Sequence, residues 1–277
     1  GISGIMAAKL SAENNKETLL LDDKNTLGGT TIYQNNDCFK IDDNHTNYWL
    51  EKEIKNIKNI KNLTIKTRTS LAAYHGYNYL LAKENITDHL SPDERKDKIR
   101  QRLWKIRAKK VIIATGSIER PLIFNNNDRP GIMLSSAIKK FIDFYGVKAG
   151  KEISLFTNND SAYETAISLK KSGVNIVSII DIRDKSSSKI IKEVEKLNIK
   201  IYWKHTIVNT EGYRRISFIE IMQLSDDGSG VIGKKIKLKT DCLGISGGWT
   251  PMVHLFTQSG GKLKFRSDDN VFLPDKD

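Results

Sequence analysis

The sequence predicts a three-layer α/β fold in which one dinucleotide-binding, Rossmann-like domain is inserted into another. Three observations predict this architecture. The chain opens on a glycine turn followed by a helical pattern, an apolar strand and an acid; strand and helix patterns restart near Gly146; and a glycine-rich segment follows the last hairpin. We therefore expect a first, discontinuous domain of residues 1–120 plus 241–277 and an inserted second domain of residues 121–240.

The opening glycine turn is the first element. Gly1-Ile2-Ser3-Gly4 matches the second half of the pattern G-x-G-x-x-G, so we expect a first strand and the first glycine upstream, with the first strand truncated in this sequence. A helix over residues 5–13 and an apolar strand over residues 18–21 follow, and the strand ends at Asp22. Eighteen residues separate Gly4 from Asp22, close to the interval of about 20 between such a turn and a ribose-binding acid.

The chemistry of nucleotide binding requires these residue types. A glycine at Gly1 lets the backbone approach a pyrophosphate, and a glycine at Gly4 lets the helix pack close to the strand. The helix N-terminus offers free N–H groups and partial positive charge. Asp22 can accept hydrogen bonds from ribose hydroxyls. The order of turn, helix, strand and acid therefore predicts a nucleotide site that includes Gly1, Gly4 and Asp22.

The remainder of the first domain carries two further marks. An amphipathic helix is expected over residues 50–61, and an alternating stretch over residues 102–107 precedes a buried strand, Lys110–Gly116, that ends in Ala-Thr-Gly. With the pair Gly28-Gly29 after Asp22, this layout resembles flavoproteins with two dinucleotide-binding domains, the glutathione-reductase-like group. In that group the Ala-Thr-Gly turn closes over the nucleotide, so the resemblance implies that Gly29 and Gly116 are cofactor-binding residues.

The inserted domain repeats the α/β alternation. The patterns predict strands over 152–156, 174–180 and 199–203, helices over 161–172 and 187–197, and a hairpin over 215–224 and 231–240. Its phosphate turn departs from the glycine pattern, because Thr157-Asn158-Asn159-Asp160 stands where glycines are needed. Asn158 and Asn159 tolerate left-handed geometry, so the turn can form. Their side chains and the negative Asp160 would crowd a pyrophosphate, and we expect a poor NAD(P)H site.

Composition excludes several classes of function. The formal net charge is +12, but lysine is spread along the chain and no aromatic-plus-basic module accompanies it, which argues against nucleic-acid binding. No apolar run approaches the roughly 20 residues of a membrane-spanning helix, and no secretory apolar region follows the N-terminus, so we expect a cytoplasmic protein without a membrane anchor. Cys38 and Cys242 are far apart and should be unpaired thiols, so thiol–disulfide chemistry is not expected.

Other candidate groups are ambiguous. The five histidines lack metal-ligand spacing, so no metal is expected; His254 faces a nucleotide or an interface, or is a surface residue. Glu119 and Arg120 form either a functional ion pair or a structural pair near the crossover between domains. Asp181 is either a vestigial ribose acid or a cap of the following turn. Residues 185–189 imitate a phosphate loop but are most simply the N-cap region of a helix.

Four segments carry a closer resemblance. Ile118–Phe124, Asn127–Met133, Phe156–Asp160 and Ser246–Pro251 together resemble the alpha subunit of heterotetrameric sarcosine oxidase, and the similarity runs over essentially the whole chain. The resemblance implies a complex with beta, gamma and delta subunits that oxidises sarcosine to glycine with oxygen and tetrahydrofolate. It also implies NAD on the alpha subunit, FAD on the beta subunit where the amine is oxidised, FMN shared at the alpha–beta interface, and tetrahydrofolate on a C-terminal part beyond this sequence. No catalytic residue is implied on this chain.

Several alternatives stay open from sequence. FAD or ATP could take the place of NAD on the first turn, because all three share the adenosine diphosphate portion. The chain could be a self-contained FAD-carrying, NAD(P)H-dependent flavoprotein oxidoreductase. It could also be the corresponding subunit of a related complex, of the proline dehydrogenase, opine oxidase or hydrogen cyanide synthase type, or a scaffold with an empty pocket.

Overall fold

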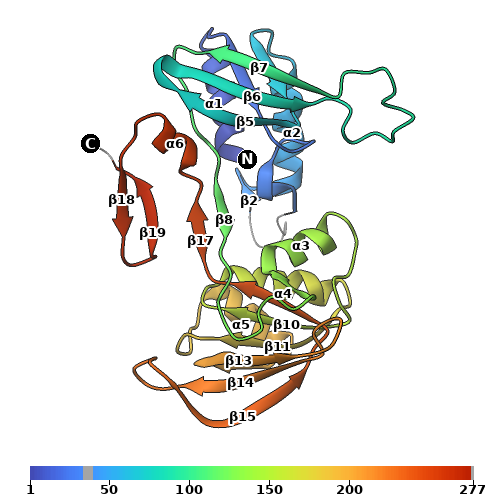
Figure 1. The fold of residues 1–277 in the computed structure, drawn as a ribbon, viewed down its shortest axis with the longest axis vertical. Helices are drawn as coiled ribbons and strands as arrows, with labels where there is room; N and C mark the ends of the chain where they lie inside the picture. The colour runs from blue at the N-terminus through green and yellow to red at the C-terminus, as the bar shows by residue number, and fades with distance from the viewer. Residues whose placement is uncertain (34–39, 276–277) are drawn as a thin grey trace. The chain divides into compact units, whose positions relative to one another are not determined.

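The computed structural model describes residues 1–33 and 40–275. The chain divides into two compact units, unit 1 (Gly1–Ser117 and Pro251–Asp277) and unit 2 (Ile118–Thr250). The chain passes between the units twice, at β8 (Ser117–Glu119) and β17 (Trp249–Pro251), and these two strands pair with each other (Figure 1).

Unit 1 begins with the elements that the opening pattern predicts. The helix and the strand follow one another as α1 and β1, and β1 pairs in parallel with β4, from Thr18↔Leu63 to Leu21↔Lys66. An antiparallel sheet in the order β5-β6-β7 follows. The elements of unit 1 are α1 (Ile2–Glu13), β1 (Thr18–Leu21), η1 (Gly29–Tyr33), β2 (Lys40–Ile41), β3 (Asn44–His45), α2 (Thr46–Lys58), β4 (Leu63–Lys66), β5 (Thr69–His75), η2 (Gly76–Asn78), β6 (Tyr79–Asn85), β7 (Gln101–Arg107), α6 (His254–Gln258), β18 (Leu263–Arg266) and β19 (Val271–Pro274).

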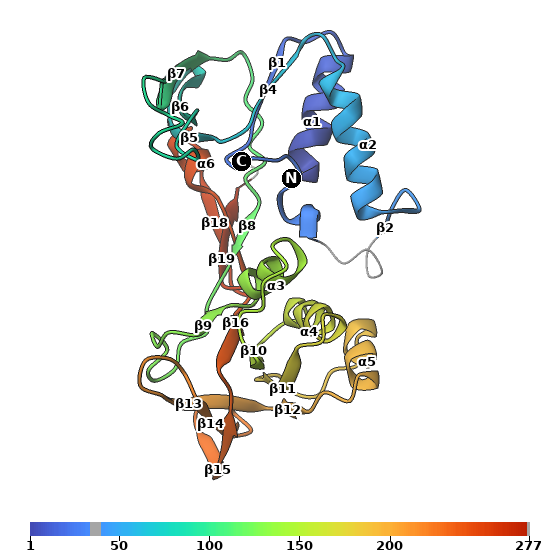
Figure 2. The same ribbon diagram turned by 90° about the vertical axis from the view of Figure 1, so that its right-hand side faces the viewer.

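The helices α1 and α2 form the core of unit 1 and lie side by side in Figure 2. Ile5 and Ala12 of α1 pack with Leu50 and Ile57 of α2, and all four side chains are buried. The predicted amphipathic helix is therefore confirmed, although it begins at Thr46 rather than at residue 50. Burial of aliphatic side chains at about 25 cal/mol per Å² stabilises this pair of helices more than their intrinsic propensity does.

The predicted buried strand Lys110–Gly116 is wrong. This segment has no strand geometry, and Ile112 is 68% exposed. A strand forms only when a neighbouring strand completes its hydrogen bonds, and none of the sheets in the described part of the chain includes this segment. The segment does contain the apolar residues from which the strand was predicted, but no described strand pairs with it.

Unit 2 contains the second series of strands and helices. The predicted strands, helices and hairpin of residues 152–240 are all present, with ends that differ by a few residues. The elements of unit 2, besides β8 and β17, are β9 (Ile132–Leu134), α3 (Ser135–Asp143), β10 (Glu152–Thr157), α4 (Ser161–Lys171), β11 (Asn175–Asp181), α5 (Lys189–Lys196), β12 (Ile201–Trp203), β13 (His205–Glu211), β14 (Phe218–Leu224), β15 (Val231–Lys239) and β16 (Cys242–Ser246).

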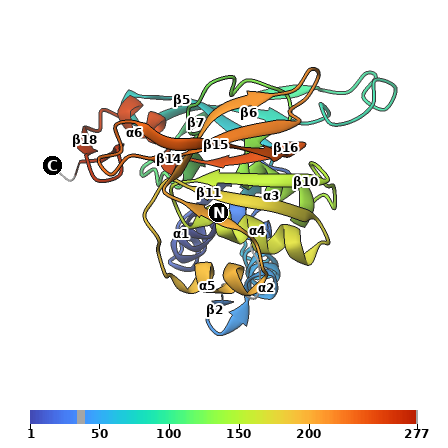
Figure 3. The ribbon, with the colours of Figure 1, turned by 90° about the horizontal axis from the view of Figure 1, so that it is seen from below.

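Unit 2 has three layers. Its middle layer is a parallel sheet in the order β12-β11-β10-β16-β9, and the antiparallel sheet β13-β14-β15 lies on the opposite face from α4 and α5 (Figure 3). Leu155 and Ile179 belong to the core on the helical side, whereas Phe156 and Ile180 belong to the core under the antiparallel sheet. Both faces of the parallel sheet are buried, which explains why its strands read as continuous apolar runs.

The expected boundary of the inserted domain at residue 240 needs correction. β16 lies inside the parallel sheet of unit 2, between β10 and β9, with Leu155↔Gly244 and Gly244↔Met133 in register. The inserted unit therefore extends to Thr250 and begins at Ile118. The glycine-rich segment that suggested a return to the first domain is instead part of a fully buried strand and the turn after it.

Candidate nucleotide-binding site

The N-terminus of α1 is one side of the candidate site, in unit 1. The helix begins directly after Gly1, and Ile5 N donates to Gly1 O at 3.1 Å. In the described part of the chain no side chain caps this end, and no acidic residue occupies its first turn. The first N–H groups of the helix can therefore bind an anion such as a pyrophosphate.

The double glycine lies against this turn. Gly29 has φ +60°, and a Cβ atom at this position would lie 2.9 Å from the Cα atom of Gly1. Gly28 has φ +128°, and a Cβ there would lie 2.7 Å from the side chain of Leu50. Glycine is thus required at both positions, at Gly29 because two backbone segments meet and at Gly28 because of packing. This close approach forms a cradle of bare backbone that a side chain would fill.

Asp22 lies beside the same turn. Its Oδ1 atom accepts a hydrogen bond from Lys24 N at 2.9 Å, and its Oδ2 atom lies 3.9 Å from the nitrogen of Gly1. The backbone of Asp22 is held by the hydrogen bonds Asp22 N to Lys66 O and Thr69 N to Asp22 O. The carboxylate is therefore fixed at the carboxyl end of β1, where a ribose hydroxyl could donate to it.

The other two predicted residues have different surroundings. A Cβ at Gly4 would lie 3.5 Å from the Cβ of Ala114, which is an ordinary van der Waals contact. Gly116 has φ +70° and accepts a hydrogen bond from Met252 N at 2.9 Å, while Thr115 Oγ1 donates to Met252 O. The structure therefore brings Gly1, Gly29 and Asp22 together, places Gly4 against Ala114, and joins Gly116 to residue 252.

The second glycine-type turn, in unit 2, is closed by a single side chain. Asn159 Oδ1 accepts hydrogen bonds from Ser161 N at 3.0 Å and from Ser161 Oγ, and Asn159 Nδ2 donates to Ser246 O at 3.1 Å. Thr157 Oγ1 accepts from Asn159 N at 3.0 Å. Neither Asn158 nor Asn159 has a positive φ, so the turn forms without the left-handed geometry that asparagine tolerates.

The acid at the end of β11 is fully buried in a polar network. Asp181 Oδ2 accepts from Tyr163 Oη and from Arg183 Nη2, both at 2.8 Å, and Oδ1 accepts from Arg183 N at 3.0 Å. Arg183 Nη1 also lies 2.9 Å from Asp160 Oδ1. Burial raises the pKa of Tyr163, and the charge of Asp181 raises it further. The observed cap by Asp181 of the turn to Arg183 agrees with the capping alternative.

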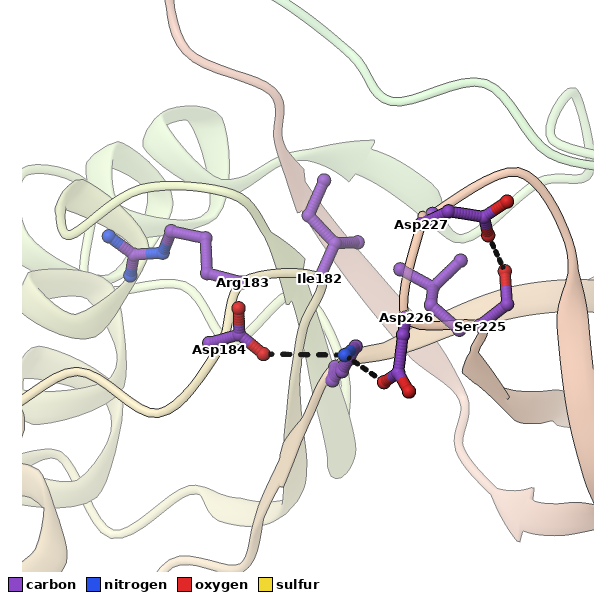
Figure 4. A pocket seen from close by; sticks show the side chains of 9 residues that line it. Ile182, Arg183, Asp184, Ser225, Asp226 and Asp227 are labelled. Carbon is purple, nitrogen blue, oxygen red and sulfur yellow. Dashed lines mark hydrogen bonds and ion pairs between the residues drawn. The ribbon is translucent and has the colours of Figure 1, made fainter.

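A small hollow lies next to this network (Figure 4). Its volume is about 220 Å³, and its lining is mostly polar. Lys204 Nζ lies 2.6 Å from Asp226 Oδ1 and 3.7 Å from Asp184 Oδ1, and hydrogen bonding to Asp226, opposed by desolvation, raises the pKa of Lys204. The ammonium group of Lys204 is thus already paired with carboxylates of the chain.

The structure shows where the residues lie whose roles the sequence left open. Glu119 is buried, and its Oε2 accepts from Ser136 N at 2.7 Å in the first turn of α3. Ser188 is the N-cap of α5, as expected for that region, and His254 is the exposed first residue of α6. Cys242 is a buried free thiol, whereas Cys38 lies outside the described residues. Within residues 1–33 and 40–275 no cluster of His, Cys, Asp or Glu could hold a metal ion.

Sequence reasoning missed the partners of these groups. Tyr163, Arg183 and Ser246 complete the networks of unit 2, but only the spacing Asp181-Ile182-Arg183 hinted at one of them. Tyr163 and Ser246 are brought in by a helix and by a strand that is distant in sequence. No local pattern could have identified them.

The fold and the two turns define a class of protein. Two nested dinucleotide-type units, with a glycine turn before the first helix and an acid at the end of the following strand in the first unit, are typical of pyridine-nucleotide and flavin oxidoreductases. The chain belongs to the family described as pyridine nucleotide-disulphide oxidoreductase, whose model matches residues 1–272. The expected α/β fold of two nested dinucleotide-binding units is confirmed.

The relatives of the chain point to one group within this class. Sarcosine oxidase subunit alpha from Corynebacterium sp. (strain P-1) is 32% identical over 277 residues, which cover 99% of this chain and 28% of the relative. The protein of the same name from Rhizobium meliloti (strain 1021) is 27% identical over 279 residues, covering 99% and 26%. The resemblance to sarcosine oxidase alpha subunits is thus confirmed, and the chain spans little more than a quarter of their length.

Solved structures share the fold. L-proline dehydrogenase from P. horikoshii matches with a TM-score of 0.68 at 21% identity and covers 100% of this chain and 46% of that chain. Thioredoxin reductase from T. acidophilum matches with a TM-score of 0.69 at 18% identity, covering 95% and 79%. At these identities the matches show the architecture alone. In the part of the chain that is described, no helix is long and apolar enough to span a membrane.

Proposed function

We propose that this chain is the nucleotide-binding portion of an alpha subunit of the sarcosine oxidase type, with NAD on unit 1. The observation that carries the proposal is the contrast between the two turns. The turn of unit 1 is bounded by bare glycine backbone at Gly1 and Gly29, whereas the turn of unit 2 is filled by the side chain of Asn159. The alpha-subunit relatives support this assignment.

Each residue of the site has a proposed role. The N–H groups after Gly1 and the backbone of Gly29 hold the pyrophosphate, and Asp22 accepts hydrogen bonds from the adenosine ribose. Gly4 lies behind the turn against Ala114, where a Cβ would also fit, and Gly116, in the Ala-Thr-Gly turn, lies over the nucleotide. A bound NAD could in general accept a hydride, but we propose that here it is held without redox chemistry. Catalytic residues are then not expected on this chain.

The reaction belongs to the complete complex. By resemblance, that complex converts sarcosine to glycine with oxygen and tetrahydrofolate, and the amine is oxidised on the beta subunit, which carries FAD. FMN is shared with the partner subunit, tetrahydrofolate binds a C-terminal domain, and gamma and delta subunits complete the assembly.

A second candidate is an FAD-carrying chain. An adenosine diphosphate moiety alone satisfies the glycine cradle and Asp22, so FAD fits the same contacts as NAD. With FAD on unit 1, the chain would be a flavoprotein oxidoreductase or the subunit of a proline, opine or hydrogen cyanide synthase-type complex. The fold shared with L-proline dehydrogenase makes this the leading alternative.

Chromatography of released nucleotide separates these functions. The full-length alpha chain is purified, denatured, and its nucleotides are identified and counted. Release of NAD without flavin supports the proposed function. Stoichiometric FAD would instead favour the flavoprotein alternatives, and ATP would exclude both.

Substitution of Asp22 separates a working site from an empty scaffold. Removing a carboxylate that accepts a ribose hydroxyl costs about 1.5–3 kcal/mol, so Asp22→Ala should weaken nucleotide binding by roughly 10- to 150-fold. Asp23→Ala is the matched control, because the carboxylate of Asp23 is half exposed and pairs with Lys24 at 2.6 Å. Unchanged nucleotide content in both variants would indicate a scaffold.

A further inference from the structure

We infer that unit 2 holds no pyridine nucleotide, because the positions at which its fold would contact the phosphates and the ribose are both occupied by side chains of the chain itself. The family fold implies a nucleotide at the carboxyl edge of the parallel sheet of this unit, at the ends of β10, β11 and β16. The inference goes beyond the nucleotide proposed for unit 1 and does not depend on it.

The phosphate position is the first to be filled. A pyrophosphate would accept hydrogen bonds from the first N–H groups of α4. Here the N–H of Ser161, the first residue of α4, donates to Asn159 Oδ1 at 3.0 Å, so an amide oxygen of the protein takes the place of a phosphate oxygen. Asn159 is itself fixed by Ser246, through Nδ2 at 3.1 Å to both the carbonyl and the hydroxyl oxygen.

Further contacts hold the side chain of Asn159 in this position. Trp249 Nε1 donates to Ser161 Oγ at 3.2 Å, and Ser161 Oγ lies 3.2 Å from Ser246 Oγ. Asp160, at the N-cap of α4, adds a negative charge at the point where a phosphate would bring two more. A nucleotide would have to displace several mutually bonded groups and approach a carboxylate.

The ribose position is the second to be filled. The acid that ends the second strand of a dinucleotide unit normally accepts from ribose hydroxyls. Asp181 occupies that place but is fully buried. Its Oδ2 atom accepts hydrogen bonds from Tyr163 and Arg183, and its Oδ1 atom accepts from Arg183. Arg183 is also bound to Asp160; although burial opposes its charge, the hydrogen bonds and charges of the two aspartates raise the pKa of Arg183. The guanidinium thus joins the phosphate and ribose positions.

The remaining edge offers no substitute. The N-terminus of α3, which follows β9 in the same parallel sheet, is occupied by the buried carboxylate of Glu119 at 2.7 Å from Ser136 N. The hollow beside Arg183 has about 220 Å³, below the roughly 300–1,000 Å³ of ligand pockets, and Lys204 in it is paired with Asp226. An electron pair from NADH or NADPH therefore does not enter the protein through unit 2.

Hydrogen–deuterium exchange on the complete complex tests this inference. The wild-type complex is exchanged with and without excess NADH and, separately, NADPH. We expect unchanged exchange in peptides that cover residues 157–163 and 181–184, because the amide of Ser161 is already bonded to Asn159. Slower exchange in these peptides on addition of either nucleotide would overturn the inference. Protection limited to residues 1–5 and 22–29 would support it.

Two variants extend the test. Asn159→Ala and Arg183→Lys, each in the assembled complex, should leave the number of adenine nucleotides per alpha chain unchanged, whereas Asp22→Ala should lower it. Loss of nucleotide in either unit 2 variant with retention in Asp22→Ala would overturn the inference. If all three variants retain nucleotide, the inference stands and the proposed unit 1 site fails, so the two failures can be told apart.

Discussion

Position 29 combines two separate requirements for glycine. Its φ of +60° is unfavourable by about 1–2 kcal/mol for residues with a Cβ, and that Cβ would lie 2.9 Å from the backbone of Gly1. The second requirement is the informative one, because backbone atoms cannot move aside as a flexible side chain can. A glycine with this surrounding is typical of a loop that lies directly against a ligand-binding turn.

The first prediction compares two glycines of similar backbone geometry. Gly29→Ala should lower nucleotide occupancy of the full-length subunit by at least about tenfold, because the new methyl group separates the loop from Gly1. Gly173→Ala is the matched control, with φ +69° and nothing within 4 Å of the new Cβ, and should cost about 1–2 kcal/mol of stability without loss of nucleotide. Equal nucleotide content in both variants would contradict the proposed site. Occupancy is measured by chromatography and stability by thermal unfolding.

The second prediction concerns the buried thiol of Cys242. Burial raises its pKa from 9.0 to about 11. Between these two pH values the folded protein keeps the thiol proton and the unfolded chain loses it, so this group lowers the free energy of unfolding as pH rises, by about 3 kcal/mol in total. Because the thiolate is the reactive form, Cys242 should resist alkylation in the native protein at pH 8.

The measurement for Cys242 is the rate of iodoacetamide labelling. The full-length subunit is labelled, the modified peptide that contains Cys242 is quantified by mass spectrometry so that other thiols do not interfere, and the same protein in denaturant gives the reference rate. Labelling of native protein should be slower by at least about 100-fold, since both burial and the raised pKa oppose it. Equal labelling rates in the native and the denatured protein would show that Cys242 is not buried.

At the scale of elements, the sheet of unit 1 is the least complete part of the chain. β1 pairs with β4 alone in the described part of the chain, Leu19 of β1 is 40% exposed, and Ile112 in the segment Lys110–Gly116 is 68% exposed. Parallel sheets are normally covered on both faces, and long apolar edge strands are normally blunted or covered. Leu19 and Ile112 therefore offer apolar surface, and β1 has no second strand partner among the described residues.

The third prediction follows from these open edges. The 277-residue chain produced alone should be poorly soluble or molten, should bind the dye ANS and should unfold without a sharp transition. ANS fluorescence and near-ultraviolet circular dichroism during heating measure this. A single cooperative melt with no dye binding would show that β1 and the 110–116 segment are adequately covered.

Helices and strands were predicted correctly where the sequence pattern that forms them is local. The helices and strands of residues 152–203 were predicted because each buries an apolar pattern that is complete within about ten residues. Lys110–Gly116 was mispredicted, because an apolar run does not reveal whether a neighbouring strand will complete its hydrogen bonds. β16 was assigned to the wrong unit, since its five buried residues suit the centre of any parallel sheet.

The candidate site was predictable to a similar degree. Gly1 and Asp22 were predicted by spacing along the chain and Gly29 by resemblance, and the structure brings the three together. For Asn159, the sequence predicted only that its side chain would crowd a pyrophosphate. Its hydrogen bonds to Ser246 link two strands far apart in sequence, and such pairings depend on the tertiary fold.

At the scale of the whole molecule, the proposed function separates nucleotide binding on this chain from amine oxidation on a partner subunit. The fourth prediction is that the isolated full-length alpha subunit consumes no oxygen when sarcosine is added, and that activity returns when the partner subunits are supplied. An oxygen electrode measures this, with the assembled complex as positive control. Turnover of sarcosine by the alpha subunit alone would contradict the proposed division of roles.

The insertion of unit 2 into unit 1 also sets an order for events at the ribosome. Unit 2 is one continuous stretch, whereas unit 1 needs residues from both sides of it. At a synthesis rate of about 5–20 residues per second, roughly 10 s pass between emergence of the two parts of unit 1. During this interval unit 2 can complete its sheet, but the Ala-Thr-Gly turn lacks Met252 and β5 lacks its hydrogen bond from Tyr74 N to Gln258. On the proposed function, the nucleotide site of unit 1 is therefore completed only after residues 251–258 have emerged, when unit 2 can already be folded.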